Sequence, residues 1–177
     1  DYLLNLYSKE LAAKEVAAAK AEQVDFLITY IHFGDEYQRF PNTEQYAIVA
    51  ELQELGFNVV IGSHPHVLQP EHSMLASNYY AIFSLGNFIS AQKLKFTDIG
   101  MMLEFEVRKD LLSGETKLHK VEHIPTYAQR KDGLISVVPL KSDEEKVLPI
   151  YVERLTYNRA SVYKDVVGHV KGGVYLD

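Results

Sequence analysis

The first sixty residues alternate between amphipathic and apolar segments, and their order predicts helix, strand, helix, strand. Apolar positions at helical spacing predict a helix over about residues 2–22. The apolar run Val24–Ile31 predicts a strand. Asn42 is suited to begin a second helix as its N-cap, with Gln45 at the third helical position reaching back to it. The buried stripe expected on that helix consists of Ile48, Leu52 and Leu55.

Gly56 ends the second helix, and a different pattern follows it. The short, nearly unbroken apolar run Phe57–Ile61 is typical of an interior parallel strand. Further strands are predicted at Tyr79–Leu85, 101–108, 116–125 and 136–140, with a turn at 110–114. A last helix is predicted between Ser161 and Gly172-Gly173. This order predicts a layered α/β or α/β/α architecture, with residues 1–177 forming a single domain.

Two of the apolar runs end in histidine. His32 follows the first run directly, and Ser63-His64-Pro65-His66 follows the second. A strand, helix and strand of one sheet form a right-handed crossover with parallel strands, whose carboxyl ends meet at one edge. We therefore expect the three imidazoles to converge on a metal site, with Pro65 stiffening the loop. The alternative for His64 and His66 is a surface turn with two solvated rings.

Polar residues close to these strand ends are further candidates for chemistry. Glu36 can ligate a metal or act as general acid or base, whereas Asp35 is expected to belong to a solvated acidic loop. Asn87 either places an amide at the crevice or closes a turn. Tyr37 is expected near the site. Surface or packing roles are predicted for the remaining histidines, His72, His119, His123 and His169.

The composition and net charge limit the kinds of partner and metal site that the chain can have. The net charge of −6 argues against a nucleic-acid partner. Cysteine is absent, so a metal must be held by nitrogen and oxygen ligands, which favours Mn, Fe or Zn. No apolar run is long enough for a membrane span. The chain begins at Asp1, within the predicted helix, so we expect an upstream segment to precede it.

Three ordered motifs resemble the CapA/PgsA family of bacterial capsule-biosynthesis proteins, which is linked to poly-γ-glutamate synthesis and export. The first is His-Phe-Gly-Asp-Glu-Tyr at 32–37, with Phe33 where the family has Trp. The second is Gly-Ser-His-Pro-His at 62–66. The third is Phe-Ser-Leu-Gly-Asn-Phe at 83–88, with Phe in place of Tyr. Together they cover about residues 24–89.

The family is similar to calcineurin-like metallophosphoesterases, and this similarity carries further expectations. It implies an α/β fold, a layered β-sandwich flanked by helices, which in this chain is incomplete at the N-terminal side. The chain would be the C-terminal part of a larger domain. The resemblance implies that His32, His64 and His66 are metal ligands. Glu36 and Asn87, which lie near the same strand ends, are the residues that we expect to be catalytic. Family motifs that would supply the other ligands of a two-metal centre are absent from the chain.

Three functional hypotheses follow. The first is a capsule-biosynthesis or export protein at the bacterial cell surface, attached to the membrane through a segment outside this chain. Its partners would be an anionic polymer, or a phosphate or carboxylate ligand, and other capsule-synthesis proteins. The second is a two-metal hydrolase of phosphoester or amide bonds. The third is a non-catalytic scaffold. An exposed sheet edge also predicts self-association.

Overall fold

The computed structural model describes residues 5–140 and 166–172. In chain order, the elements are α1 (Lys9–Ala21), β1 (Ile28–His32), α2 (Thr43–Leu55), β2 (Val59–Ser63), β3 (Leu68–Met74), the 3₁₀ turn η1 (Leu75–Ser77), β4 (Tyr79–Leu85), β5 (Ile99–Lys109), β6 (Thr116–Lys131) and β7 (Leu134–Pro139). Residues 166–171 form a further short helix. No helix in the described ranges is both long and apolar enough to cross a membrane.

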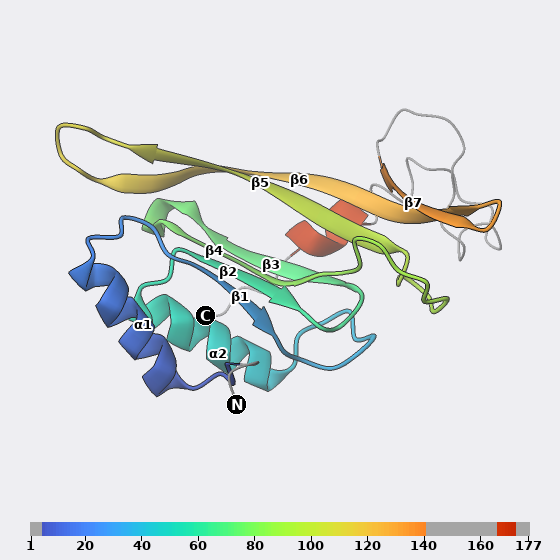
Figure 1. Cartoon of the computed structure of the whole chain (residues 1–177), viewed down its shortest axis with the longest axis horizontal. Helices are drawn as coiled ribbons and strands as arrows, with labels where there is room; N and C mark the ends of the chain where they lie inside the picture. The colour runs from blue at the N-terminus through green and yellow to red at the C-terminus, as the bar shows by residue number, and fades with distance from the viewer. Residues whose placement is uncertain (1–4, 141–165, 173–177) are drawn as a thin grey trace.

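The strands form two sheets (Figure 1). Sheet A has the order β1-β2-β4-β3, in which β1, β2 and β4 are parallel and β3 is antiparallel to β4. The predicted parallel pairing across α2 is confirmed, and it places His32 opposite Ser63. Sheet B is the antiparallel meander β5-β6-β7, with a bulge between Glu106 and Val107.

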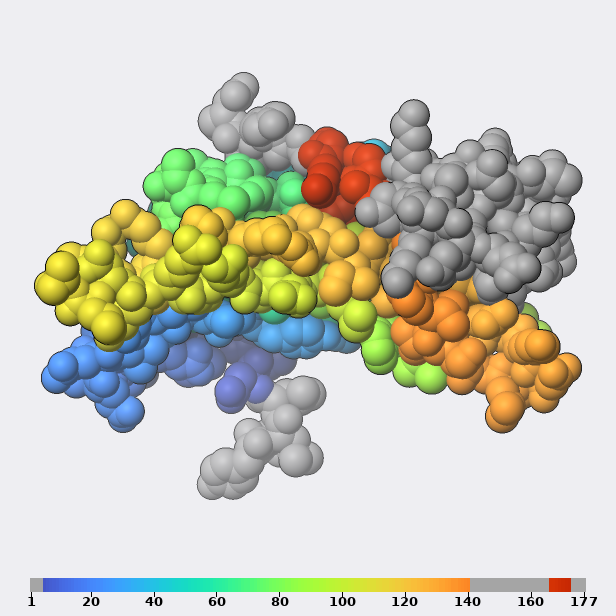
Figure 2. All heavy atoms as spheres, turned by 90° about the horizontal axis from the view of Figure 1, so that it is seen from above, coloured from blue at the N-terminus to red at the C-terminus, as the bar shows by residue number. Residues whose placement is uncertain are grey.

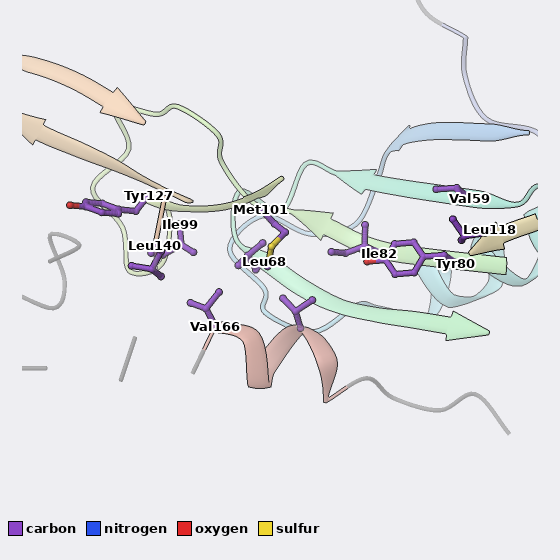
Figure 3. Packing of buried hydrophobic residues seen from close by; sticks show 11 residues of the cluster. Val59, Leu68, Tyr80, Ile82, Ile99, Met101, Leu118, Tyr127, Leu140 and Val166 are labelled. Atoms are coloured by element: carbon purple, nitrogen blue, oxygen red, sulfur yellow. The ribbon is translucent and has the colours of Figure 1, made fainter. Parts of the chain in front are cut away.

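Two apolar clusters hold the layers together. α1 and α2 pack on one face of sheet A through residues such as Val16 and Leu52, which meet Val60 and Phe83. The other face of sheet A meets sheet B. The side chains in that cluster include Val59, Tyr80 and Ile82 of sheet A and Ile99, Met101, Leu118 and Tyr127 of sheet B (Figure 3). Figure 2 shows sheet B running along this side of the molecule, with the helix 166–171 beside it.

The mixed α/β class is therefore confirmed, with two sheets and helices on one face of sheet A. The finer comparison with a metallophosphoesterase-like sandwich stays a prediction, as does its incompleteness at the N-terminal side. β1 lies at an edge of sheet A, and its Ile28 and Tyr30 side chains are 54% and 66% exposed. This open edge is the feature on which the expected self-association rests.

Several boundaries differ from the predicted ones. α1 begins after Ser8, whose hydroxyl accepts a hydrogen bond from the Leu11 N–H and caps the helix. Strand β3 was not predicted, because Pro70 and the lack of alternation conceal it. As an edge strand it tolerates proline. The predicted N-cap Ser161 lies outside the described residues, and the short helix ends before Gly172, as expected.

One polar cluster lies between the two sheets. His123 on β6 contacts the Glu71 carboxylate on β3, and the Tyr80 hydroxyl donates a hydrogen bond to the same carboxylate. Burial and the Glu71 charge raise the pKa of Tyr80, so its hydroxyl keeps its proton and remains a donor. His123 therefore has a packing role, as the sequence predicted, since it links sheet B to sheet A.

Candidate metal centre

The carboxyl ends of β1 and β2 bring three imidazoles into one neighbourhood. His32 ends β1, while His64 follows the last residue of β2. The ring centroids of His32 and His64 are 4.5 Å apart, and those of His64 and His66 are 6.1 Å apart. The convergence expected from parallel strands is therefore present in the structure.

Glu36, His64 and His66 form the set best arranged to hold an ion. One ligand atom from each lies within 4.8 Å of the others, and Glu36 Oε1 is 3.7 Å from His66 Nε2. Metal–ligand bonds of about 2.0–2.2 Å allow two ligands of one ion to be up to about 4.4 Å apart. The Glu36 side chain is 49% exposed, and its distance from His66 already lies within that limit. Two imidazoles and one carboxylate suit Zn, Mn or Fe.

Asn87 fixes the orientation of the His66 ring. Its Oδ1 is 3.0 Å from His66 Nδ1, while its amide nitrogen donates to Gln92 Oε1 and to the Thr97 carbonyl, both at 2.9 Å. Because those two acceptors fix which end of the amide carries the hydrogens, Oδ1 faces His66 and accepts the proton of Nδ1. The lone pair of Nε2 then points toward Glu36, as a metal ligand requires.

The backbone of the histidine loop has an unusual conformation. His64 and His66 have φ values of 104° and 59°, in the left-handed half of backbone space that residues with a side chain seldom occupy. A residue before proline ordinarily has extended backbone with negative φ, so His64 departs from the expected geometry. The loop is held by the Tyr37 N–H, which donates to the Pro65 carbonyl at 2.7 Å. Such strain is concentrated at functional sites.

Tyr37 lies against the candidate metal centre, as expected. Its ring stacks on His66 with the centroids 6.0 Å apart, and its hydroxyl accepts a hydrogen bond from the Gln92 amide at 3.3 Å. Loss of hydration and the neighbouring Glu36 carboxylate raise the pKa of Tyr37. The phenol therefore keeps its proton beside Glu36. Gln92 was not singled out in the sequence, because no motif marks it.

A chain of buried amides supports the loop that carries Glu36. Gln45 Oε1 accepts from the Asn42 N–H in the predicted capping box, and Gln45 Nε2 donates to Gln69 Oε1 at 2.8 Å. Gln69 Nε2 then donates to the Gln38 carbonyl at 2.9 Å. Gln45 and Gln69 are 1% and 0% exposed. The start of α2, β3 and the Glu36 loop are thus tied together away from water.

Replacing Gln69 by leucine is expected to destabilise the domain by about 2 kcal/mol, because the Gln45 amide and the Gln38 carbonyl lose their buried partner. Urea unfolding measures the change. The matched control is Gln53→Leu on α2, whose amide donates to the sulfur of Met74 at 3.6 Å in a more exposed position. Equal stabilities of the two variants would contradict a structural role for the amide chain.

The other sequence-predicted residues lie around this set. His32 Nδ1 is 3.4 Å from the Ser63 hydroxyl, and His32 does not belong to the three-residue group, so its role as a ligand stays a prediction. Glu36 was predicted to be catalytic, and its carboxylate lies among the candidate ligand atoms. Asp35 is exposed and accepts a hydrogen bond from Asn42, in keeping with an acidic surface loop.

An apolar groove borders His32 on the open side of β1. It has a volume of about 600 Å³ and runs between the start of α1 and the edge of sheet A. Its lining includes Leu6, Leu11, Ile31, Leu52 and Phe57. His32 thus lines this groove, while its ring centroid is 4.5 Å from that of His64.

Comparisons with known proteins agree with the three motifs. The family model described as "Bacterial capsule synthesis protein PGA_cap" matches residues 3–92, which include Glu36, His64, His66 and Asn87. The chain is 27% identical over 101 residues to the "PGA biosynthesis protein CapA" of Bacillus subtilis, covering 57% of this chain and 26% of the relative. It is 26% identical over 102 residues to the "Capsule biosynthesis protein CapA" of Bacillus anthracis, covering 56% and 24%.

The chain spans about a quarter of the length of these curated relatives. The family match covers more than half of the chain and contains β1, α2, β2 and β4, the elements that position the candidate metal centre. The chain therefore belongs to the bacterial capsule synthesis protein family.

Proposed function

We propose that this chain provides a metal-binding pocket used in the synthesis or export of a capsule polymer, poly-γ-glutamate, at the bacterial cell surface. The observation that carries the proposal is the convergence of Glu36, His64 and His66 within a region that matches the family. The names of the relatives, which refer to PGA and capsule biosynthesis, support the polymer class.

The pocket is suited to an anionic ligand once it holds a cation. Glu36, His64 and His66 would hold a divalent ion, which would act there as a Lewis acid toward a carboxylate or phosphate oxygen. The net charge of −6 does not prevent the binding of an anionic ligand, because the field of an ion in the site outweighs the field of distant surface charges. Asn87 keeps the His66 ring in the tautomer that such binding needs.

Hydrolysis of a phosphoester or amide bond is a second candidate. The observation that favours it is the position of the Tyr37 phenol, whose ring stacks on His66 and whose hydroxyl lies beside the Glu36 carboxylate. A positioned phenol can donate a proton to a leaving group. Activity would depend on further ligands from the rest of the protein, since the known two-metal sites use more carboxylates than this chain supplies.

The test uses the full-length protein in a capsule-forming bacterium that lacks its own copy. The variant His64→Ala/His66→Ala is expected to abolish surface polymer, whereas His119→Ala, an exposed histidine on β6, leaves it at the wild-type level. Wild-type polymer with the double variant would overturn the proposal. The length of polymer chains after incubation with the purified protein separates hydrolysis, which shortens them, from binding, which does not.

A further inference from the structure

We propose that Gln92 is a positioning residue that connects two of the candidate metal ligands, His66 and Glu36, and keeps both oriented for a shared cation. Its side-chain oxygen accepts a hydrogen bond from the Asn87 amide at 2.9 Å, and its side-chain nitrogen donates to the Tyr37 hydroxyl at 3.3 Å. Asn87 contacts His66, and the Tyr37 hydroxyl lies beside Glu36. Gln92 thus lies between two side chains that each adjoin one ligand. This inference rests on the proposed function.

The direction of these hydrogen bonds is set by one backbone carbonyl. The Thr97 carbonyl can only accept, so the Asn87 side chain turns its nitrogen toward it, at 2.9 Å. The second hydrogen on that nitrogen points to Gln92, which therefore presents its oxygen there and its nitrogen to Tyr37. The oxygen of Asn87 is left to meet His66 Nδ1. Every donor in the chain from His66 to Tyr37 thus points the same way.

Both ends of this chain of hydrogen bonds serve the metal site. At one end His66 keeps its proton on Nδ1, so the lone pair of Nε2 is left for a cation. At the other end the Tyr37 oxygen already accepts from Gln92, so its own proton is directed to the neighbouring Glu36 carboxylate. Hydrogen-bonded partners of this kind orient a metal-binding carboxylate. Hydrogen bonds that run in one direction also polarise and strengthen one another.

Sheet B holds Gln92 in place. Arg130 of β6 donates through one guanidinium nitrogen to the backbone carbonyls of Gln92 and Ser90, at 2.7 and 3.3 Å. The Gln92 N–H in turn donates to the Ser90 hydroxyl at 3.1 Å. Because a guanidinium is rigid and planar, these contacts fix the backbone from which the Gln92 side chain extends. The position of Gln92 therefore depends on sheet B, whereas the candidate ligands lie on loops that follow strands of sheet A.

Glutamine is the side chain that meets both demands of this position. It must accept a hydrogen bond at one end, from Asn87, and donate one at the other, to Tyr37. Leucine, of similar size, does neither. Glutamate accepts at both ends, so it keeps the partner of Asn87 and loses the donor to Tyr37. These two substitutions therefore separate the two halves of the chain of hydrogen bonds.

The experiment measures the tautomer of His66 in the metal-free chain by nitrogen NMR, with its signals identified by their loss in His66→Ala, and the Zn²⁺ affinity by calorimetry. Gln92→Leu is expected to populate the tautomer with the proton on Nε2 and to weaken Zn²⁺ binding about tenfold. Gln92→Glu should keep the wild-type tautomer, because Asn87 retains its acceptor. The control Gln53→Leu makes the same change on α2 and should alter neither quantity.

A wild-type tautomer or an unchanged Zn²⁺ affinity in Gln92→Leu would overturn the positioning role, as would equal changes in Gln53→Leu. If Gln92→Leu does not fold, Gln92→Ala takes its place, because it removes the same two polar groups without adding apolar surface. Failure of the proposed function looks different. The wild-type chain would then bind no Zn²⁺, while the tautomer of His66 in the metal-free variants would still decide the role of Gln92.

Discussion

Alanine at position 62 is expected to destabilise the domain by about 3 kcal/mol or more, enough to abolish folding in a marginally stable protein. A Cβ on Gly62 would lie 2.0 Å from the Phe83 carbonyl oxygen and 2.8 Å from the Phe33 ring. The oxygen belongs to the backbone of β4, which cannot move away without breaking its pairing with β2. Since His64 follows two residues later, the strain would also reach the histidine loop.

Urea unfolding of the purified chain measures this effect. Gly168→Ala is the matched control, because a Cβ on that glycine meets nothing within 4 Å among the described residues and its helix gains from alanine. We expect the control to be as stable as the wild type, or more stable by up to about 1 kcal/mol. A Gly62→Ala protein whose unfolding free energy is within about 0.5 kcal/mol of the wild type would contradict the close packing of β2 on β4.

Removal of either candidate histidine ligand should give the largest functional effect. His64→Ala or His66→Ala is expected to weaken Mn²⁺ or Zn²⁺ binding about a hundredfold or more, because each removes one of the three candidate ligand atoms. Asn87→Ala is expected to weaken it about tenfold, since the His66 ring loses the partner that fixes its tautomer. Calorimetric titration of the metal-free chain measures all three affinities.

Two further variants distinguish residues that bind the metal from residues that only lie near it. His119→Ala should leave the affinity unchanged, because that residue lies on the exposed part of β6. His32→Ala tests the remaining sequence prediction. If His32 is a third imidazole ligand, its removal should lower the metal affinity as much as His64→Ala does. If its ring only contacts His64, the metal affinity should change little. Unchanged affinity in both His64→Ala and His66→Ala would contradict the ligand assignment.

Much of the fold could be predicted from local signals. The capping box at Asn42 and the glycine at position 56 fixed both ends of α2, where the structure has them. The apolar run after Gly56 and the run at 79–85 identified the two interior strands. β3 was missed because an edge strand with proline carries neither alternation nor an apolar run.

The candidate site was predictable only in part, for a physical reason. Parallel pairing of β1 and β2 follows from the crossover rule, so the convergence of His32 and His64 could be expected. The positive φ of His64, the pairing of Asn87 with His66 and the role of Gln92 depend on how loops far apart in the sequence pack together. Such contacts leave no periodic signal in the sequence.

X-ray absorption at the zinc edge of the zinc-loaded chain tests the metal centre most directly. We predict nitrogen and oxygen ligands with the scattering of two imidazoles, which is lost when His64 and His66 are both replaced by alanine. A zinc spectrum that shows no imidazole, or that stays the same in the double variant, would contradict it.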